Sequence, residues 1–376
     1  MRHRPADLPA VLGERGGPLV RRLTELLRAI EQGRRSCSPS NLDLLAAHER
    51  LERLGRPLNA VCSVIGAPDR APAGRLAGHP VGVKDIIAVA GVPTSCGSPA
   101  SDPRPAAADA VLVRRLREAG AEVFATTQCL EYAAGFAHPE VGDTRNPRDP
   151  SRYGLLPVEG VFPLSPSCDH AGTLTATVAG AADLLATLHI SLASLTTPPG
   201  RATFTVGVLV AQLADPSVTP PVRDAVRSAL AALDAAGWRI KELTAPWLGQ
   251  LASWDDVLTV LVAREAHLVH QHRDTSRYAE GTRALLAFGA SVSDSQYAAA
   301  LDRRAELTAA IEASLAGVDV LAGPTVGYQA PEQDPPFGAG DDNGESRFTG
   351  PYNLSGHPAV SLPVPAAGLP AGLQLA

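Results

Sequence analysis

The sequence predicts an α/β fold in which helices cover a largely parallel β-sheet. Two stretches, 78–127 and 204–243, alternate short runs of β-branched residues with longer segments of helical spacing. Of the 376 residues, 45% are hydrophobic, which is enough for a large core. We therefore expect one domain over 1–376, comprising a helical region at 1–60, a core at 61–200 and a second part of the core at 201–376.

The predicted helices are segments in which apolar residues recur every three or four positions. In the segment 109–120, Asp109 lies where the helix dipole favours a negative charge, and Gly120 ends the helix. A later segment begins with Pro221 and ends with Gly237, which is the usual asymmetry of helix ends. The predicted helices span 18–30, 41–54, 109–120, 221–237, 255–272 and 294–315.

The predicted strands are short runs rich in Val, Ile and Thr that lie between turn residues. They span 78–89, 121–127, 204–209, 238–243 and 318–322. Between 328 and 347 the chain is rich in Pro, Gly, Asp and Glu and has no periodicity, so we expect a long loop there, either a surface crossing or a lid.

Composition argues against several classes of function. A net charge of −6 with mixed signs and only 4% aromatic residues argue against nucleic acid as a partner. No apolar run reaches the length of a membrane span, and residues 1–7 lead into no signal-type core, so we expect a cytoplasmic protein. The five cysteines show no paired spacing and are predicted to be free thiols: Cys37, Cys62, Cys96, Cys129 and Cys168.

Lys84 is the most informative single residue. The chain has two lysines, Lys84 and Lys241, among 33 basic residues, and Lys84 interrupts a predicted buried strand. A desolvated lysine can lose its proton near neutral pH and act as a base, which arginine cannot do. The alternative is a lysine at a strand end whose ammonium reaches water or pairs with Asp85.

Other groups of polar residues are weaker candidates. Asp169 and His170 are adjacent, so on an extended chain they point to opposite faces, and we expect structural roles for both. His267, His270 and His272 lie on a predicted helix with no third ligand at a suitable spacing, so no metal site is expected. Nothing in the sequence indicates a cofactor.

Ordered blocks over nearly the whole chain resemble the amidase signature hydrolases, which include bacterial amidases and the amidase subunit of the glutamyl-tRNA amidotransferase. The blocks span 80–85, 90–98, 109–127, 131–135, 146–152, 165–172, 323–325 and 348–363. The resemblance implies a mixed, largely parallel sheet with helices on both faces. It also implies amide hydrolysis by a serine nucleophile, a relay serine held by a cis peptide bond, and Lys84 as the general base.

The resemblance breaks after Arg152. There the family continues into a Gly/Ser-rich loop with the relay serine, and then into a Gly-Gly-Ser turn with the nucleophile and the oxyanion hole. This chain passes directly to Tyr153, and a Gly-Gly-Ser-Ser-Gly-Gly loop occurs nowhere in the 376 residues. Because the two serines act with the lysine as a unit, we expect the family mechanism to be lost.

Three hypotheses remain. The first is a non-hydrolytic homologue that binds a small amide or carboxylate, or acts through a protein partner or as a homo-oligomer. The second is an active amidase or acyl-transfer enzyme with a substitute nucleophile near Lys84, for which Cys96 and Ser98 are the candidates. The third is a degraded family member without activity.

Overall fold

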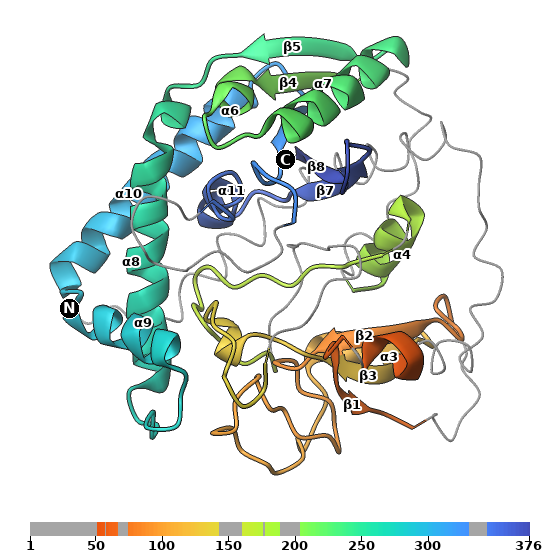
Figure 1. Ribbon diagram of the computed structural model, residues 1–376, viewed down its shortest axis with the longest axis vertical. Helices are drawn as coiled ribbons and strands as arrows, with labels where there is room; N and C mark the ends of the chain where they lie inside the picture. The colour runs from red at the N-terminus through yellow and green to blue at the C-terminus, as the bar shows by residue number, and fades with distance from the viewer. Residues whose placement is uncertain are drawn as a thin grey trace.

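The strands form two sheets, which are separate in Figure 1, one in the upper and one in the lower half of the molecule. The computed structural model describes residues 51–56, 58–66, 74–142, 160–175, 177–188, 204–330 and 344–376. The first sheet has the order β1 (Val61–Val64), β3 (Glu122–Thr127), β2 (Pro80–Lys84). The second has the order β5 (Arg239–Leu243), β4 (Thr205–Leu209), β6 (Val320–Pro324), β8 (Ala371–Leu375), β7 (Val360–Val364).

The predicted α/β class is confirmed, but the sheet is divided and less parallel than the sequence indicates. The pairs β2–β3, β4–β5 and β4–β6 are parallel, whereas β1–β3, β6–β8 and β7–β8 are antiparallel. Every antiparallel pair contains β1, β7 or β8, the three strands that the sequence patterns did not predict. β1 has only four residues, β7 contains Pro363, and β8 contains no β-branched residue, so none of the three shows the usual strand signal.

The helices lie along the sheets and on one side of the molecule, where α8 and α10 run from the upper sheet toward the lower half (Figure 1). The α-helices are α3 (Val111–Glu118), α4 (Val178–Leu188), α6 (Val210–Ala214), α7 (Pro220–Ala235), α8 (Leu251–His270), α9 (Glu280–Ser291), α10 (Asp294–Ser314) and α11 (Gly350–Ser355). Short helical turns occur at Leu51–Gly55, Glu131–Ala133 and Pro246–Gln250.

The predicted elements in the described residues lie close to these bounds, with three differences. The strand predicted at 78–89 ends at Lys84, the last residue of β2, and the chain turns at 85–86, so Lys84 lies at a strand end and not within a strand. Of the helix predicted at 41–54, only the end is described, as the π-helical turn Leu51–Gly55; the helix predicted at 18–30 lies outside the described residues. Asp109 precedes α3, but its carboxylate accepts the N–H of Ala90 at 2.8 Å and pairs with Arg117 at 2.8 Å. It therefore fixes the loop before the helix instead of capping it.

The two sheets have separate cores that a third cluster joins. The larger core packs β4, β6 and β8 against α7, α8 and α10, and the smaller one packs α3 against β2 and β3. Between them, the ring of His270 on α8 lies 4.8 Å from that of Tyr132 and 5.5 Å from that of Phe162, centroid to centroid. Aromatic contacts therefore help to hold the two halves together.

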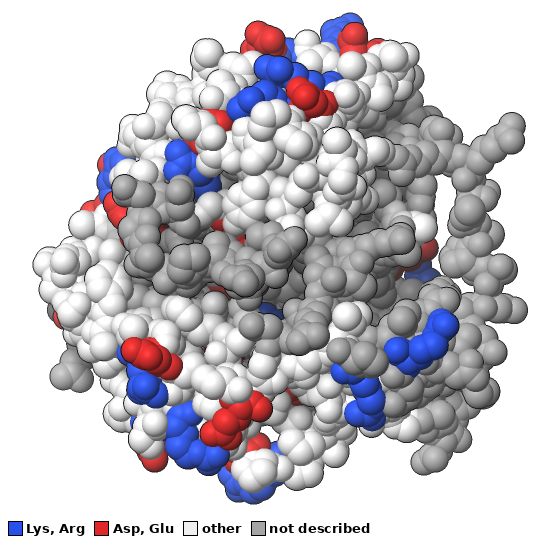
Figure 2. All heavy atoms as spheres, in the orientation of Figure 1, with Lys and Arg blue, Asp and Glu red and all other residues white. Residues whose placement is uncertain are grey.

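Charged residues on the face drawn in Figure 2 lie in small groups of both signs near the rim, and the described residues there form no extended patch of one sign. None of the described helices is long and apolar enough to cross a membrane.

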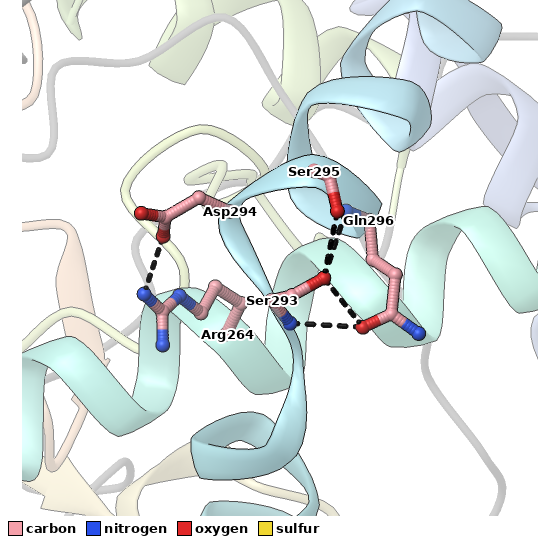
Figure 3. A network of polar contacts seen from close by, with 5 residues as sticks. All are labelled: Arg264, Ser293, Asp294, Ser295 and Gln296. Carbon is pink, nitrogen blue, oxygen red and sulfur yellow. Dashed lines mark hydrogen bonds and ion pairs between the residues drawn. The ribbon is translucent and has the colours of Figure 1, made fainter.

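The start of α10 carries a capping box, shown in Figure 3. The Ser293 hydroxyl accepts the N–H of Gln296 at 3.2 Å, and the Gln296 side chain accepts the N–H of Ser293 at 2.9 Å. We expect Ser293→Ala to lower the free energy of unfolding by about 1 kcal/mol, because the N–H of Gln296 loses its acceptor. Urea unfolding followed by circular dichroism measures this. The neighbouring substitution Ser295→Ala should change the free energy of unfolding by less than about 0.5 kcal/mol. Equal losses in the two variants would contradict a capping role for Ser293.

Candidate active site around Lys84

Lys84 is the last residue of β2 and is partly exposed. It lies beside Thr127, the last residue of the parallel strand β3. The positive charge of Lys84 lowers the pKa values of Cys129, Cys96 and Asp169, in each case against a larger opposing effect of burial. The segments of two thiols lie next to the end of β2, because the N–H of Cys96 donates to the carbonyl of Asp85 at 3.0 Å and Cys129 follows Thr127 by two residues.

The carboxylate of Asp85, the neighbour of Lys84, holds the next turn of the chain. It is 1% exposed, and it accepts the N–H of Ser95 at 3.1 Å and the Ser95 hydroxyl. Burial raises the pKa of this carboxyl group, and the bonds from Ser95 partly offset that effect. Asp85, considered from the sequence as a partner of Lys84, therefore serves to fix the turn that contains Cys96 and Ser98.

Cys96 and Ser98 lie close to Lys84 in the chain but are enclosed. The Cys96 side chain is 2% exposed, and burial raises the pKa of its thiol, so the thiolate is not populated at neutral pH. Ser98 is 3% exposed and donates its hydroxyl to Glu131 Oε1 at 2.6 Å. The other oxygen of Glu131 accepts the N–H of Ala279 at 2.7 Å, which ties this turn to the start of α9.

Cys129 is the third group near Lys84, and burial raises the pKa of its thiol to about 12. It is 8% exposed. The four cysteines within the described ranges are free thiols, as predicted, and Cys37 lies outside these ranges. The described thiols near Lys84 are thus protonated at neutral pH, a state in which sulfur is a poor nucleophile.

The segment that follows the break in the resemblance lies against the residues just after Lys84. Val161 forms an antiparallel bridge with Ile87, and the N–H of Phe162 donates to the carbonyl of Ile86 at 2.7 Å. Further along, the Asp169 carboxylate accepts the N–H groups of Leu164 and Ser165 at 2.9 and 3.0 Å. The block 146–152, before the break, lies outside the described residues.

Asp169 and His170 bond to different groups. Asp169 closes its own loop, whereas Nδ1 of His170 donates to the carbonyl of Cys168 at 2.6 Å. Burial raises the pKa of Asp169 to about 6, the negative charge of Glu265 adds to this rise, and Lys84 opposes it. Burial lowers the pKa of His170. Their contacts are those of structural groups, in line with the prediction.

Glu265 on α8 is a buried centre that sequence reasoning missed. Its carboxylate accepts four bonds: from the Ser165 hydroxyl at 2.8 Å, from the Ser167 N–H and hydroxyl at 2.8 and 2.5 Å, and from the Tyr297 hydroxyl at 2.8 Å. The side chain is 6% exposed. The available signal was a glutamate between Ala263 and Ala266 on the apolar face of a helix, where an unpaired carboxylate would be costly.

Of the three clustered histidines, His270 has an aromatic environment. It is 2% exposed, and its Nδ1 lies 3.0 Å from the hydroxyl of Tyr278. In the part of the chain that the structure describes, no three His, Cys, Asp or Glu side chains are grouped as a metal site requires.

We expect His270 to make the protein less stable as the pH falls. Burial and the nearby Arg273 lower the pKa of His270 to about 4, so between pH 6.5 and 4 the unfolded chain binds more protons than the native state. The contribution of His270 therefore makes the free energy of unfolding about 2 kcal/mol lower at pH 5 than at pH 7. Asp169 and Asp255, with pKa values raised by burial to about 6, act in the opposite sense, because their native forms hold protons more tightly.

The test therefore compares variants across pH. The difference in unfolding free energy between wild type and His270→Phe should change by about 2 kcal/mol from pH 7 to pH 5. His272→Asn, at an exposed position, serves as the control and should leave the pH dependence of the wild type intact. A pH-independent difference between wild type and His270→Phe would contradict the buried neutral histidine.

Comparisons with known proteins agree with this architecture. The sequence model of the family described as Amidase matches residues 66–153 and 151–376, which is most of the chain. The chain belongs to the amidase signature family. An amidase from Pseudomonas putida is 28% identical over 355 residues, covering 77% of this chain and 75% of the relative. A glutamyl-tRNA(Gln) amidotransferase subunit from Gloeobacter violaceus is 27% identical over 435 residues, covering 87% of each chain.

A crystal structure of an amidase has a TM-score of 0.74 with 28% identity and covers 94% of each chain. The corresponding subunit of the Thermotoga maritima glutamyl-tRNA(Gln) amidotransferase, at 20% identity and a TM-score of 0.67, shows the same fold over 88% of this chain and 86% of its own. The chain therefore has the fold of the amidase signature proteins, as the sequence blocks predicted.

Proposed function

We propose that this family member does not hydrolyse amides but binds a small carboxamide or carboxylate next to Lys84. The observation that carries the proposal is the direct passage from Arg152 to Tyr153, which omits the serine-bearing segment on which the family mechanism depends. Lys84 remains at the end of β2, where its charge acts on Asp169. Without the serines, Lys84 has no nucleophile to activate. Its ammonium is a cationic hydrogen-bond donor, which is suited to binding a carbonyl or carboxylate oxygen.

Two features of the comparisons support the omission. The family match is divided into two parts that meet at 151–153, the point at which the sequence departs from the family pattern. The alignment with the Gloeobacter violaceus protein extends over 435 positions, more than the 376 residues of this chain, so it must open gaps in the chain.

The described residues around Lys84 also favour binding over catalysis. Cys96 and Ser98 are enclosed, and the thiols of Cys96 and Cys129 are protonated at neutral pH. None of these three groups combines exposure with an activated state, which a nucleophile requires.

The test measures ammonia release and binding on the same protein. We expect no ammonia from benzamide or propionamide, and binding of benzamide to the wild type by calorimetry that is weakened at least tenfold in Lys84→Met. Lys241→Met, the other lysine of the chain, is the matched control and should bind as the wild type does. Turnover lost in Lys84→Met would instead support a substitute nucleophile, with Cys96→Ala and Ser98→Ala as the next variants.

Two further outcomes concern the other hypotheses. A cooperative thermal transition is expected, since a chain that could not compensate for the omission would expose apolar surface and aggregate. Aggregation without a transition would favour a degraded family member. One relative is a subunit of an amidotransferase, so a protein partner is a second candidate ligand. Where that partner is a second copy of this chain, light scattering of the purified protein would detect the self-association.

A further inference from the structure

The two sheets have four edge strands in the part of the chain that the structure describes, and β5 (Arg239–Leu243) differs from the other three. β1 pairs with β3 through a register shift, β2 begins with Pro80, and β7 contains Pro363. Bulges and prolines hinder the pairing of an edge strand with another chain. β5 has no proline and pairs with β4 without a register shift. Its backbone is therefore the least protected of the four edges.

The outer side of β5 presents backbone groups that a further strand could bind. In a parallel pair, alternate residues of a strand bond to its neighbour. The N–H of Arg239 donates to the carbonyl of Phe204 at 2.8 Å, so the odd-numbered residues of β5 face β4. The N–H and C=O groups of Ile240 and Glu242 accordingly point away from the sheet, and no strand within the described ranges pairs with them. In Figure 1, β5 is the uppermost strand of the molecule.

The side chains of β5 give this edge a definite order of charges. Arg239, Lys241 and Glu242 are exposed, whereas Ile240 and Leu243 pack in part against the larger core. Because side chains alternate along a strand, Arg239 and Lys241 project from one face of the sheet, and Glu242 projects from the other. One face of the edge therefore carries two positive charges at alternate positions.

This order opposes pairing with a second copy of the chain. Two copies related by a two-fold axis would pair β5 antiparallel, and the outward groups at 240 and 242 define three registers that overlap at least three residues. Ile240 opposite Glu242 brings the two Lys241 residues together. Ile240 opposite Ile240 places Arg239 opposite Lys241 twice, and the third register pairs Glu242 with itself. Like charges directly opposite each other destabilise a strand pair, so each register is disfavoured.

We infer that β5 is an interaction edge that rejects a second copy of this chain and accepts an extended segment of a protein partner with acidic residues at alternate positions. Two carboxylates of such a segment would lie beside Arg239 and Lys241, while its backbone bonds to Ile240 and Glu242. Backbone bonds supply affinity in strand addition, and opposite charges across the pair select the partner. Because β5 and β2 belong to different sheets, the inference is independent of binding at Lys84.

The experiment uses the chain itself as the probe. The double variant Arg239→Glu/Lys241→Glu has acidic residues at alternate positions of β5. Neither the wild type nor this variant should associate through β5 alone, since each places like charges opposite its own copy. In an equal mixture, opposite charges face each other in the same registers. Sedimentation equilibrium should then give a dissociation constant at least tenfold lower for the mixed pair than for either protein alone.

A matched control separates pairing at the edge from attraction between opposite net charges. Arg114→Glu/Arg227→Glu has the same net charge as the double variant, but its substitutions lie at exposed positions on α3 and α7. This control should not associate with the wild type. Hydrogen exchange followed by mass spectrometry should show protection of the peptide containing 239–243 in the mixed pair and in neither protein alone.

The outcomes decide both halves of the inference. A mixture that does not associate, or that associates no better than the control mixture, would overturn the acceptance of an acidic strand. Self-association of the wild type with protection at 239–243 would overturn the rejection of a second copy. Should the double variant not fold, Lys241→Glu provides a second measurement. With Ile240 opposite Ile240, its new carboxylate faces Arg239 of the other copy, so a folded Lys241→Glu variant that stays monomeric would contradict the inference.

Discussion

Replacing Glu265 with alanine is expected to lower the free energy of unfolding by about 3–5 kcal/mol, the largest effect we expect from a single side chain. The substitution leaves the hydroxyls of Ser165, Ser167 and Tyr297 and one backbone N–H without their buried acceptor. Each unsatisfied buried donor costs about 1–3 kcal/mol before relaxation. Urea unfolding monitored by circular dichroism measures the loss.

Two further variants show whether the acceptor matters or only the side chain. Glu265→Gln keeps the shape and one acceptor oxygen, so its loss should be clearly smaller than that of Glu265→Ala. Glu118→Ala removes an exposed carboxylate 3.9 Å from Arg114 and should change the stability by less than about 0.5 kcal/mol. Similar losses for Glu265→Ala and Glu118→Ala would contradict the buried network.

The second large effect is expected at Gly97, in the turn between Cys96 and Ser98. Gly97 has φ of 61°, and a Cβ atom there would lie 2.2 Å from the carbonyl oxygen of Cys129. Because this oxygen belongs to the backbone, the turn or the segment around Cys129 must move. We expect Gly97→Ala to cost about 2–4 kcal/mol, the sum of left-handed backbone strain and the clash.

Gly91 is a matched control for the clash. Its φ is 79°, but a Cβ atom there would meet nothing within 4 Å, so Gly91→Ala carries only the conformational cost of about 1 kcal/mol. The difference between the two variants in thermal or urea unfolding isolates the contact with Cys129. Equal losses would mean that the turn is not packed against the segment after β3.

Much of the chain could be predicted from local patterns. Helical spacing located α3, α7, α8 and α10 within a few residues, since an amphipathic helix repeats its signal over several turns. The strands β1, β7 and β8 were missed because β1 has only four residues, β7 contains Pro363 and β8 contains no β-branched residue. The sheet was accordingly predicted as more parallel than it is, because these strands make every antiparallel pair.

The candidate site was only partly predictable. Lys84 could be found because a charge within an apolar strand is visible in the sequence and because its block resembles the family pattern. Cys96 and Ser98 were reasonable candidates by chain distance, yet their burial to 2% and 3% exposure depends on how the rest of the chain covers them. Sequence distance measures neither burial nor access.

The sequence by itself indicated the family and the order of the predicted helices and strands, because each of these is recorded in consecutive residues. Only the tertiary structure decided that the strand of Lys84 ends at this residue and that Glu265 holds the loop of Ser165 and Ser167. Glu265 and Ser165 are 100 residues apart in the chain. Contacts over such distances depend on how helices and sheets pack, and no local pattern of spacing or charge encodes that packing.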